Sequence, residues 1–139
     1  MRLVPATQED LGFLVALRNE EVNARFSKRG ALSKEEIEQD YLANPQKHVY
    51  IAGLEGQRAG YAILADLGAR KYEVSVAISP GFRGRRLGRE IVKAATRVGI
   101  SEFGSPELVA EIYSANVASL RVFQAQGYEL IDDSEEPWT

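Results

Sequence analysis

A short segment in the middle of the chain holds the residues with the clearest chemical potential. It reads Arg83-Gly84-Arg85-Arg86-Leu87-Gly88, it follows a Pro80-Gly81 turn, and an amphipathic stretch comes after it. A helix that begins there would present unpaired backbone N–H groups and the positive end of its dipole, which together bind phosphate. Arginine adds forked donors for phosphate oxygens, and Gly84 and Gly88 let a ligand approach the backbone. The segment predicts an anion site at residues 78–88, although a helix start with solvated arginines would have the same composition.

The charge pattern narrows the kind of anion. No Gly-Lys-Ser/Thr follows at the spacing of a P-loop, and the glycines do not form a dinucleotide fingerprint. The chain carries a net charge of −3, yet residues 83–97 hold six basic residues against Glu90, a local balance of +5 that leaves −8 on the remainder. A concentrated positive segment on an acidic body favours a compact anionic ligand, whereas nucleic-acid-binding proteins are more often basic over a whole face. We therefore expect no nucleic-acid partner.

The residue types that are scarce or missing exclude several kinds of chemistry. The chain has no cysteine, so it forms no disulfide and cannot use thiol catalysis. His48 is the only histidine, which argues against a zinc site or a Ser-His-Asp triad; we predict that it opens a strand and that the protein binds no metal. No apolar run approaches the roughly 20 residues that cross a bilayer, and the N-terminus lacks the features of a signal peptide. We expect a cytoplasmic protein with no membrane partner.

The periodicity of apolar residues predicts the elements that position the basic loop. Ser33-Lys34-Glu35-Glu36 is a capping box that opens a helix, and short turns at Glu55-Gly56 and Gly68 separate three alternating strands, as in an antiparallel meander. The predicted strands cover residues 2–4, 48–54, 58–67, 71–78, 108–113 and 128–131, and the predicted helices cover 7–19, 33–43, 86–103 and 116–126. This order predicts an α/β (α+β) fold with a mixed, mostly antiparallel central sheet and helices on both faces.

At 139 residues the chain is long enough for one core. We expect a single domain over residues 1–139, in which residues 132–139 form a mobile acidic tail.

Two motifs in the same order resemble those of the GNAT superfamily of N-acetyltransferases. The stretch from Asn116 to Tyr128 has Asn, then Ser three positions later, an aromatic residue four positions after that, and a final Gly-aromatic pair. The stretch from Val76 to Gly88 is similar to the family's cofactor motif, Gln/Arg-x-x-Gly-x-Gly/Ala. On these motifs the chain is identified as a member of the superfamily, with a resemblance that extends over residues 2–131. The resemblance implies a GNAT-like fold and acetyl-CoA as acyl donor.

The resemblance also implies which residues hold the cofactor. Coenzyme A carries roughly four negative charges, which the +5 segment matches. The backbone of Val76 and Ile78 would pair with the pantetheine, the basic loop would surround the pyrophosphate, and Asn116 would bond the pantetheine or a water. The implied cofactor residues are Val76, Ala77, Ile78, Arg83, Gly84, Arg85, Arg86, Leu87, Gly88, Arg89, Asn116, Ser119 and Phe123. Arg86 stands where a glycine is usual, and we predict ordinary helix-start backbone there rather than a positive φ.

The same comparison gives candidates for catalysis by direct attack of an amine on the thioester. Many family members have a tyrosine, the acid for the departing thiolate, where this chain has Phe123, and phenylalanine cannot donate a proton. Tyr113 and Ser119 are the replacements we consider. Glu73 is the candidate base, but strand alternation puts Tyr72, not Glu73, on the face of Val76, so Tyr72 is also a candidate; a bulge would reverse this. The alternative function is a non-catalytic acetyl-CoA-binding module.

The N-terminal half carries the information on the acceptor. The stretches Leu17-Arg18-Asn19 and Arg25-Phe26-Ser27 look like the branch of ribosomal-protein N-terminal acetyltransferases and nucleotide amino-sugar N-acetyltransferases. That likeness implies that Arg18 and Asn19 lie near the acceptor, which would be an amino sugar or a peptide α-amine; the alternative is a polar helix end in which Arg18 meets the dipole. Family members often have a seventh strand. Here that strand would be missing, supplied by the partner in a homodimer, or formed by the tail around Trp138.

Overall fold

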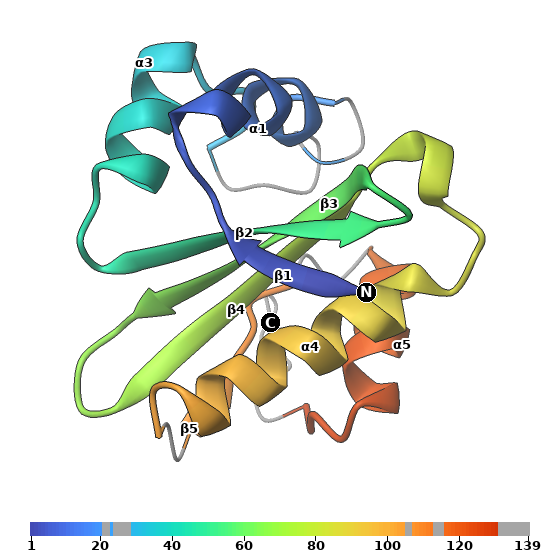
Figure 1. Ribbon diagram of the computed structural model, residues 1–139. Helices are drawn as coiled ribbons and strands as arrows, with labels where there is room; N and C mark the ends of the chain where they lie inside the picture. The colour runs from blue at the N-terminus through green and yellow to red at the C-terminus, as the bar shows by residue number, and fades with distance from the viewer. Residues whose placement is uncertain (21–22, 24–28, 105–106, 113–115, 131–139) are drawn as a thin grey trace.

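The computed structural model describes residues 1–20, 23, 29–104, 107–112 and 116–130. Its centre is one five-stranded sheet whose strands lie side by side in chain order, β1 to β5 (Figure 1). Each neighbouring pair is antiparallel except β4 and β5, which are parallel. The predicted mixed, mostly antiparallel sheet is therefore confirmed. The strands are β1 (Arg2–Pro5), β2 (Lys47–Leu54), β3 (Gln57–Asp66), β4 (Lys71–Ile78) and β5 (Glu107–Val109).

Helices cover both faces of this sheet, as predicted. On one face lie α1 (Leu11–Arg18) and α3 (Lys34–Ile37), which continues as one π-helical turn, η2 (Glu38–Leu42). On the other face lie α4 (Leu87–Ser101) and α5 (Val117–Ala125) (Figure 1). Two short 3-10 turns, η1 (Gln8–Asp10) and η3 (Pro80–Phe82), precede α1 and the basic loop.

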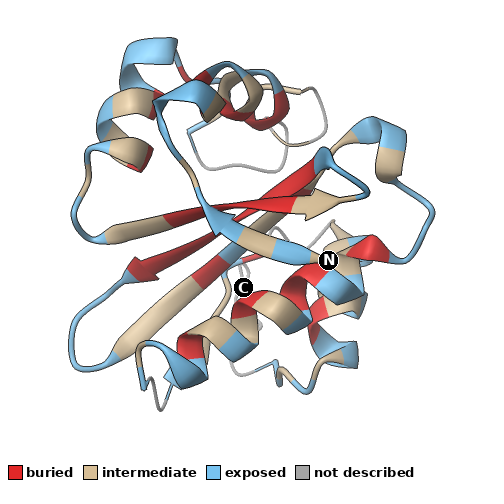
Figure 2. Cartoon of the chain, in the orientation of Figure 1, coloured by how far each residue is buried: buried red, intermediate tan, exposed pale blue. Residues whose placement is uncertain are grey.

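Strand alternation divides the core into two layers. Tyr61 and Ile63 of β3 belong to the layer under α1, and Ala62 and Leu64 belong to the layer under α4. Figure 2 shows the consequence, because the buried residues run along the central strands and the inner sides of the helices. A sheet that is buried on both faces holds its register firmly, since a slip of one residue would exchange the two layers.

The turns and helix caps that the local sequence predicts are present in the structure. The Ser33 Oγ accepts from the Glu36 N–H at 3.1 Å, and the Ser33 N–H donates to Glu36 Oε1 at 2.9 Å, which completes the capping box. Glu55 and Gly56 have φ of 54° and 78° in the turn between β2 and β3, which is the left-handed geometry of a tight hairpin.

Near the C-terminus, the predicted fifth strand is present but shorter than predicted, and the predicted strand at residues 128–131 was wrong for its described part, residues 128–130. The fifth strand ends at Val109, and Ala110, Glu111 and Ile112 leave the sheet. Residues 128–130 form no strand: the Tyr128 ring packs edge-on against Phe123, with centroids 5.0 Å apart, and its hydroxyl lies 2.8 Å from the Thr96 hydroxyl. These contacts turn the segment into the helical layer instead of the sheet. Tyr113, Ile131 and the tail with Trp138 lie outside the described residues.

Candidate functional site

The first feature of the site is a strand edge that opens part-way along β4. On one side β4 pairs with β3 through to Ile78, whereas on the other side its pairing with β5 ends at Glu73 and Val109. In the described part of the chain, no strand pairs with the edge of β4 beyond Glu73. A split of this kind between two strands leaves room for an extended ligand beside β4.

The direction of the backbone groups along this edge follows from the hydrogen bonds at its two ends. The Ser79 N–H donates to the Ala59 carbonyl at 2.8 Å, and the Leu67 N–H donates to the Lys71 carbonyl at 2.9 Å. Both Lys71 and Ser79 therefore face β3, and backbone groups alternate along an antiparallel strand. It follows that the N–H and C=O groups of Val76 and Ile78 face the open edge, where they can pair with amides of a ligand.

The second feature is the basic loop between β4 and α4, which turns through two left-handed residues. Gly84 has φ of 78°, and Arg86, at the N-cap of α4, has φ of 60° and ψ of 20°. The prediction of ordinary helix-start backbone at Arg86 was therefore wrong. A non-glycine residue in this region costs about 1–2 kcal/mol because its Cβ crowds the backbone. The chain must reverse into α4 at this point, and Gly84 lies too early to make the second turn.

The arginines of the loop differ in the partners they have. The Arg83 guanidinium makes two hydrogen bonds to the Glu20 carboxylate, at 2.9 and 3.2 Å. Arg85 lies 3.7 Å from a Glu55 carboxylate oxygen, and its guanidinium lies 5.2 Å from the centre of the Phe82 ring. Arg86 and Arg89 are exposed and form no ion pair with any described residue.

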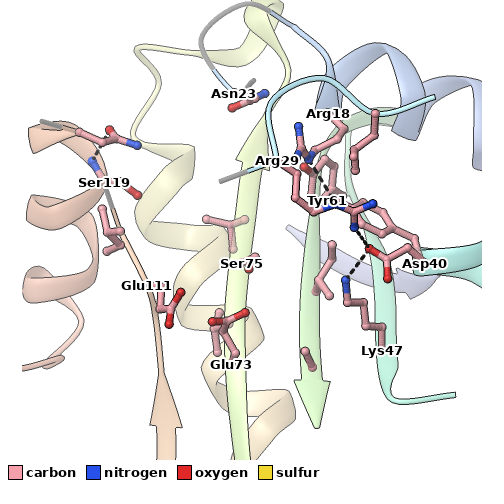
Figure 3. A pocket seen from close by; sticks show the side chains of 18 of the residues that line it. Arg18, Asn23, Arg29, Asp40, Lys47, Tyr61, Glu73, Ser75, Glu111 and Ser119 are labelled. Atoms are coloured by element: carbon pink, nitrogen blue, oxygen red, sulfur yellow. Dashed lines mark hydrogen bonds and ion pairs between the residues drawn. The ribbon is translucent and has the colours of Figure 1, made fainter. Parts of the chain in front are cut away.

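The third feature is a cavity of about 280 Å³ that wraps around the open edge of β4. Figure 3 shows that Arg18, Asp40 and Lys47 lie at one end, Glu73 and Ser75 along β4, and Ser119 at the other end. Glu111 lines the cavity from the segment after β5. The cavity therefore joins the α1 face of the sheet, through the gap between β4 and β5, to the start of α5.

Arg18 dominates the α1 end of the cavity. It is the last residue of α1 and only 7% exposed. Its Nε donates to the Tyr41 hydroxyl at 3.0 Å, and its Nη1 donates to the Gly30 carbonyl at 2.8 Å. The Tyr61 ring lies edge-on to Tyr41, 6.4 Å between centroids, and burial raises the pKa of the Tyr61 hydroxyl far above its ordinary value.

Beside Arg18, Asp40 joins two further cations. The same Asp40 oxygen lies 2.8 Å from Arg29 Nη1 and 3.1 Å from Lys47 Nζ. Although burial pushes the pKa of Asp40 upward, the hydrogen bond to Lys47 and the charges of Lys47 and Arg29 outweigh it and hold the pKa below its ordinary value. Asp40 is therefore ionised at neutral pH.

At the far end, α5 begins on the cavity wall. The Asn116 side chain accepts a hydrogen bond from the Ser119 N–H at 3.3 Å, which makes Asn116 the N-cap of α5. Phe123, one turn further along α5, is 4% exposed and also contributes to the wall. The positive end of the α5 dipole thus faces the cavity.

Comparison with known proteins identifies the family. The family model for an acetyltransferase (GNAT) domain matches residues 1–129. The chain belongs to the GNAT acetyltransferases. No curated protein matches the chain with significant similarity.

Solved structures support the same fold for this acetyltransferase. A domain from Methanocaldococcus jannaschii aligns with a TM-score of 0.85 at 19% identity, over 99% of this chain and 93% of the other. A ribosomal-protein-alanine N-acetyltransferase from Brucella melitensis aligns with a TM-score of 0.79 at 26% identity, over 95% and 86%. A spermidine N-acetyltransferase from Vibrio cholerae, in complex with CoA and spermine, aligns with a TM-score of 0.81 at 14% identity, over 99% and 90%.

The acetyltransferase fold brings some predicted catalytic residues to the cavity and not others. Glu73 and Ser119 line it. Tyr72 does not, because its ring is stacked on Phe103 in the layer under α4, with centroids 4.9 Å apart and 9° between planes. The predicted alternation is thus present, but the cavity reaches the α1 face, where Glu73 points. Tyr113 lies outside the described residues.

The two residues predicted to lie near the acceptor have different surroundings in the acetyltransferase. Arg18 lines the cavity. The Asn19 side chain instead exchanges two hydrogen bonds with the backbone of Leu32, at 2.6 and 2.7 Å, and holds the end of α1 against the next segment. Asn19 is absent from the cavity wall.

Among the residues predicted to bind acetyl-CoA, some present backbone groups at the open strand edge and others present positive charge. The open edge at Val76 and Ile78 suits the pantetheine amides, and Arg86 and Arg89 beside the start of α4 suit phosphate. Ala77 lies in the core under α1, and Leu87 in α4 is buried. Gly88 has a packing reason of its own, since a Cβ there would lie 3.4 Å from a Val122 methyl group of α5.

Among the described residues, no three His, Asp or Glu side chains are placed to hold a metal ion, and no helix is long and apolar enough to span a membrane.

Several residues that line the cavity were not predicted from the sequence. Glu111 is a carboxylate two residues beyond β5, opposite the edge of β4, and this position was its only sequence signal. Nothing local marked Tyr41, Asp40 and Lys47, which lie on α3–η2 and β2, far from the motifs.

Proposed function

We propose that this acetyltransferase moves the acetyl group of acetyl-CoA onto a primary amine held between Arg18 and Glu73. One observation carries the proposal: a single cavity joins the α1 face to the start of α5 and passes Glu73 at the point where β4 separates from β5. The acceptor enters from the α1 side and the thioester from the split, so the two meet beside Glu73.

The chain has separate means of holding each part of the donor. The outward N–H and C=O groups of Val76 and Ile78 pair with the pantetheine arm as an added strand would. The start of α4, with Arg86 and Arg89, binds the phosphates through its orphan N–H groups and positive charge. Bound acetyl-CoA supplies a thioester, an acetyl group activated toward nucleophiles.

Glu73 acts as the general base for the acceptor. An amine is protonated at neutral pH, and Glu73 removes a proton to expose the nitrogen lone pair. The amine nitrogen then bonds to the carbonyl carbon as the carbon–sulfur bond breaks, and its second proton passes to the sulfur. Such proton transfer by a placed carboxylate contributes about 10²–10⁴-fold to the rate. Glu111 adds negative charge at the same place and favours binding of the ammonium form.

Phe123 has no hydroxyl and cannot donate a proton to the departing thiolate. The start of α5 supplies the donor instead. Ser119 lies in the first turn of α5, on the cavity wall, and its hydroxyl is a donor that can reach the departing sulfur. The helix is nine residues long, and its positive end further stabilises negative charge on sulfur. Tyr113 is the second candidate for this donor.

The test is an assay of free thiol with acetyl-CoA and a panel of amines that includes amino sugars, peptides with free N-termini and small amines. We expect amine-dependent thiol release from the wild type. Glu73→Gln should lower kcat by about 10²–10⁴-fold and leave the Kd for CoA within a factor of two or so. The matched control is Glu107→Gln, because Glu107 is an exposed β5 carboxylate near Lys71 that does not line the cavity.

Two results would count against this assignment. An unchanged kcat in Glu73→Gln would remove Glu73 as the base. Tight CoA binding with no thiol release on any amine would instead favour a binding module without catalysis.

A further inference from the structure

Arg83 of the basic loop is joined to the chain just beyond α1. Its Nη2 and Nη1 donate to Glu20 Oε2 and Oε1 at 2.9 and 3.2 Å, so two parallel hydrogen bonds connect the guanidinium to the carboxylate. The two side chains are 36% and 25% exposed. A two-bond pair of this kind fixes the orientation of its partners as well as their distance. It joins segments that are 63 residues apart in the chain.

Glu20 is in turn attached to the part of α1 that borders the cavity. Its N–H donates to the Leu17 carbonyl at 3.2 Å, which continues the last turn of the helix. Arg18, in that turn, lines the cavity and bonds to Tyr41 and Gly30. The ion pair therefore connects the α1 end of the cavity to the loop that leads into α4, although α1 and α4 lie on opposite faces of the sheet (Figure 1).

The position of Arg83 in the loop separates it from the start of α4. Its N–H donates to the Pro80 carbonyl at 3.3 Å, so Arg83 ends the turn η3. The left-handed residues Gly84 and Arg86 follow, and only then does α4 begin. Arg83 thus precedes the reversal of the chain, whereas Arg86 and Arg89 lie at the N-cap and in the first turn of α4.

The pair with Glu20 also makes Arg83 a poor ligand for phosphate. To bind a phosphate, its guanidinium would exchange two charge-assisted hydrogen bonds for new ones, so the net gain is small. A phosphate that approached the intact pair would meet the Glu20 carboxylate as well, and like charges repel. Arg86 and Arg89 are exposed and form no ion pair with any described residue, so neither gives up such a bond.

We propose that Arg83 is a positioning residue for the acceptor side of the site and not a ligand of the coenzyme A phosphates. It keeps its two bonds to Glu20 when coenzyme A is bound, and it holds the end of α1, and with it Arg18, against the basic loop. This role rests on the proposed function, in which Arg18 borders the acceptor. It departs from what the family motif implies for Arg83, which is a place beside the pyrophosphate.

Calorimetric titration with CoA at two salt concentrations tests the first half of the proposal. Arg89→Gln should weaken binding about tenfold, the effect of one charge-assisted contact, and make the Kd less sensitive to salt. Arg83→Gln should weaken binding by no more than about twofold through the Glu20 charge that it exposes, and a second change, Glu20→Gln, should remove that loss. A loss in Arg83→Gln as large as in Arg89→Gln would overturn the proposal.

The second half is tested by the KM for the amine of the panel with the highest kcat/KM, at saturating acetyl-CoA. Arg83→Gln and Glu20→Gln should each raise this KM by about three- to fivefold, the upper range for a partly exposed ion pair, and the double variant should resemble the single ones. The double-mutant cycle isolates the pair from any other contact of Glu20. Additive effects, or an unchanged KM in Arg83→Gln, would contradict the positioning role.

Arg58→Gln is the matched control. Arg58 Nε lies 2.9 Å from Oδ1 of Asp10, the N-cap of α1, so this ion pair holds the same helix at its other end. Neither residue lines the cavity. The change should lower stability as Arg83→Gln does but leave the KM and the Kd for CoA unchanged. An equal rise in KM would mean that the KM responds to any loosening of α1, and the specific role of Arg83 would be lost.

Hydrogen exchange separates failure of this inference from failure of the proposed function. If no amine releases thiol, the proposed transfer is wrong, and the position of α1 is then measured without an acceptor. With CoA bound, the amides in the last turn of α1 should exchange faster in Arg83→Gln than in the wild type, and Arg58→Gln should not accelerate them. Equal exchange of these amides in Arg83→Gln and the wild type would show that the ion pair does not hold this end of α1.

Discussion

At Arg86, the residue that would favour stability differs from the residue that would favour ligand binding. Arg86 adopts the left-handed region at the N-cap of α4, and we propose that its charge binds a phosphate of coenzyme A. Replacement by glycine removes a conformational cost of about 1–2 kcal/mol and a few tenths of a kcal/mol of repulsion between the guanidinium and the positive end of α4. Glycine also has more conformational freedom in the unfolded chain, which stabilises the unfolded state by about 0.5–1 kcal/mol and offsets part of this gain.

The balance predicts that Arg86→Gly raises the free energy of unfolding by about 1 kcal/mol. For a domain of this size, that corresponds to a rise in Tm of about 3–5 °C. The same change should weaken CoA binding about tenfold, because it removes one charge-assisted contact. It should also make the Kd less sensitive to salt, since fewer exposed charges then act on the phosphates.

Thermal unfolding without ligand and calorimetric titration with CoA at two salt concentrations measure both effects. Arg86→Asn provides a second variant, because asparagine tolerates left-handed backbone better than arginine does. The matched control is Arg85→Gly. Arg85 has no positive φ and its guanidinium lies over Phe82, so this change relieves no strain and should lower Tm slightly.

An equal fall in Tm for Arg86→Gly and Arg85→Gly would contradict this expectation. That result would mean that the left-handed conformation at Arg86 stores no strain. A gain in Tm with an unchanged Kd would keep the strain but remove Arg86 from the phosphate site.

Two further predictions concern the scaffold. Gly60→Ala should destabilise the protein by about 3 kcal/mol, because its Cβ would collide with the Ala77 carbonyl oxygen across β3 and β4; Gly53→Ala is the control, since a Cβ there finds its nearest atom at 3.8 Å, and equal losses in urea unfolding would contradict the argument. Asp40→Asn should lower stability at pH 7 and converge on the wild type in acid. The pKa of Asp40 lies below 3.8 in the folded state, so its stabilising effect is present above that value and disappears as the pH falls through the folded pKa. A constant difference between pH 7 and pH 2.5 would show that the charge of Asp40 does not act on Lys47 and Arg29.

Local signals in the sequence were sufficient for most of the fold. The capping box at Ser33, the turn at Glu55-Gly56 and the alternation along β2 to β4 each depend on residues close together in the chain, and all formed as predicted. The position of the basic loop, between a strand and a long amphipathic helix, was also evident from the sequence. Its family followed from two motifs that the domain match supports.

Only the tertiary structure decided which residues meet in the cavity. Alternation correctly separated Tyr72 from Glu73, but the side of the sheet on which the cavity opens to Glu73 depends on where α1 and α3 pack. Arg18 meets Tyr41, and Lys47 faces Glu73 across β3, through contacts between segments far apart in the chain. The left-handed backbone of Arg86 and the turn of Tyr128 away from the sheet are likewise set by packing. Residue order determines local conformation, whereas the charged side chains that line the cavity come together only when distant segments of the chain pack against one another.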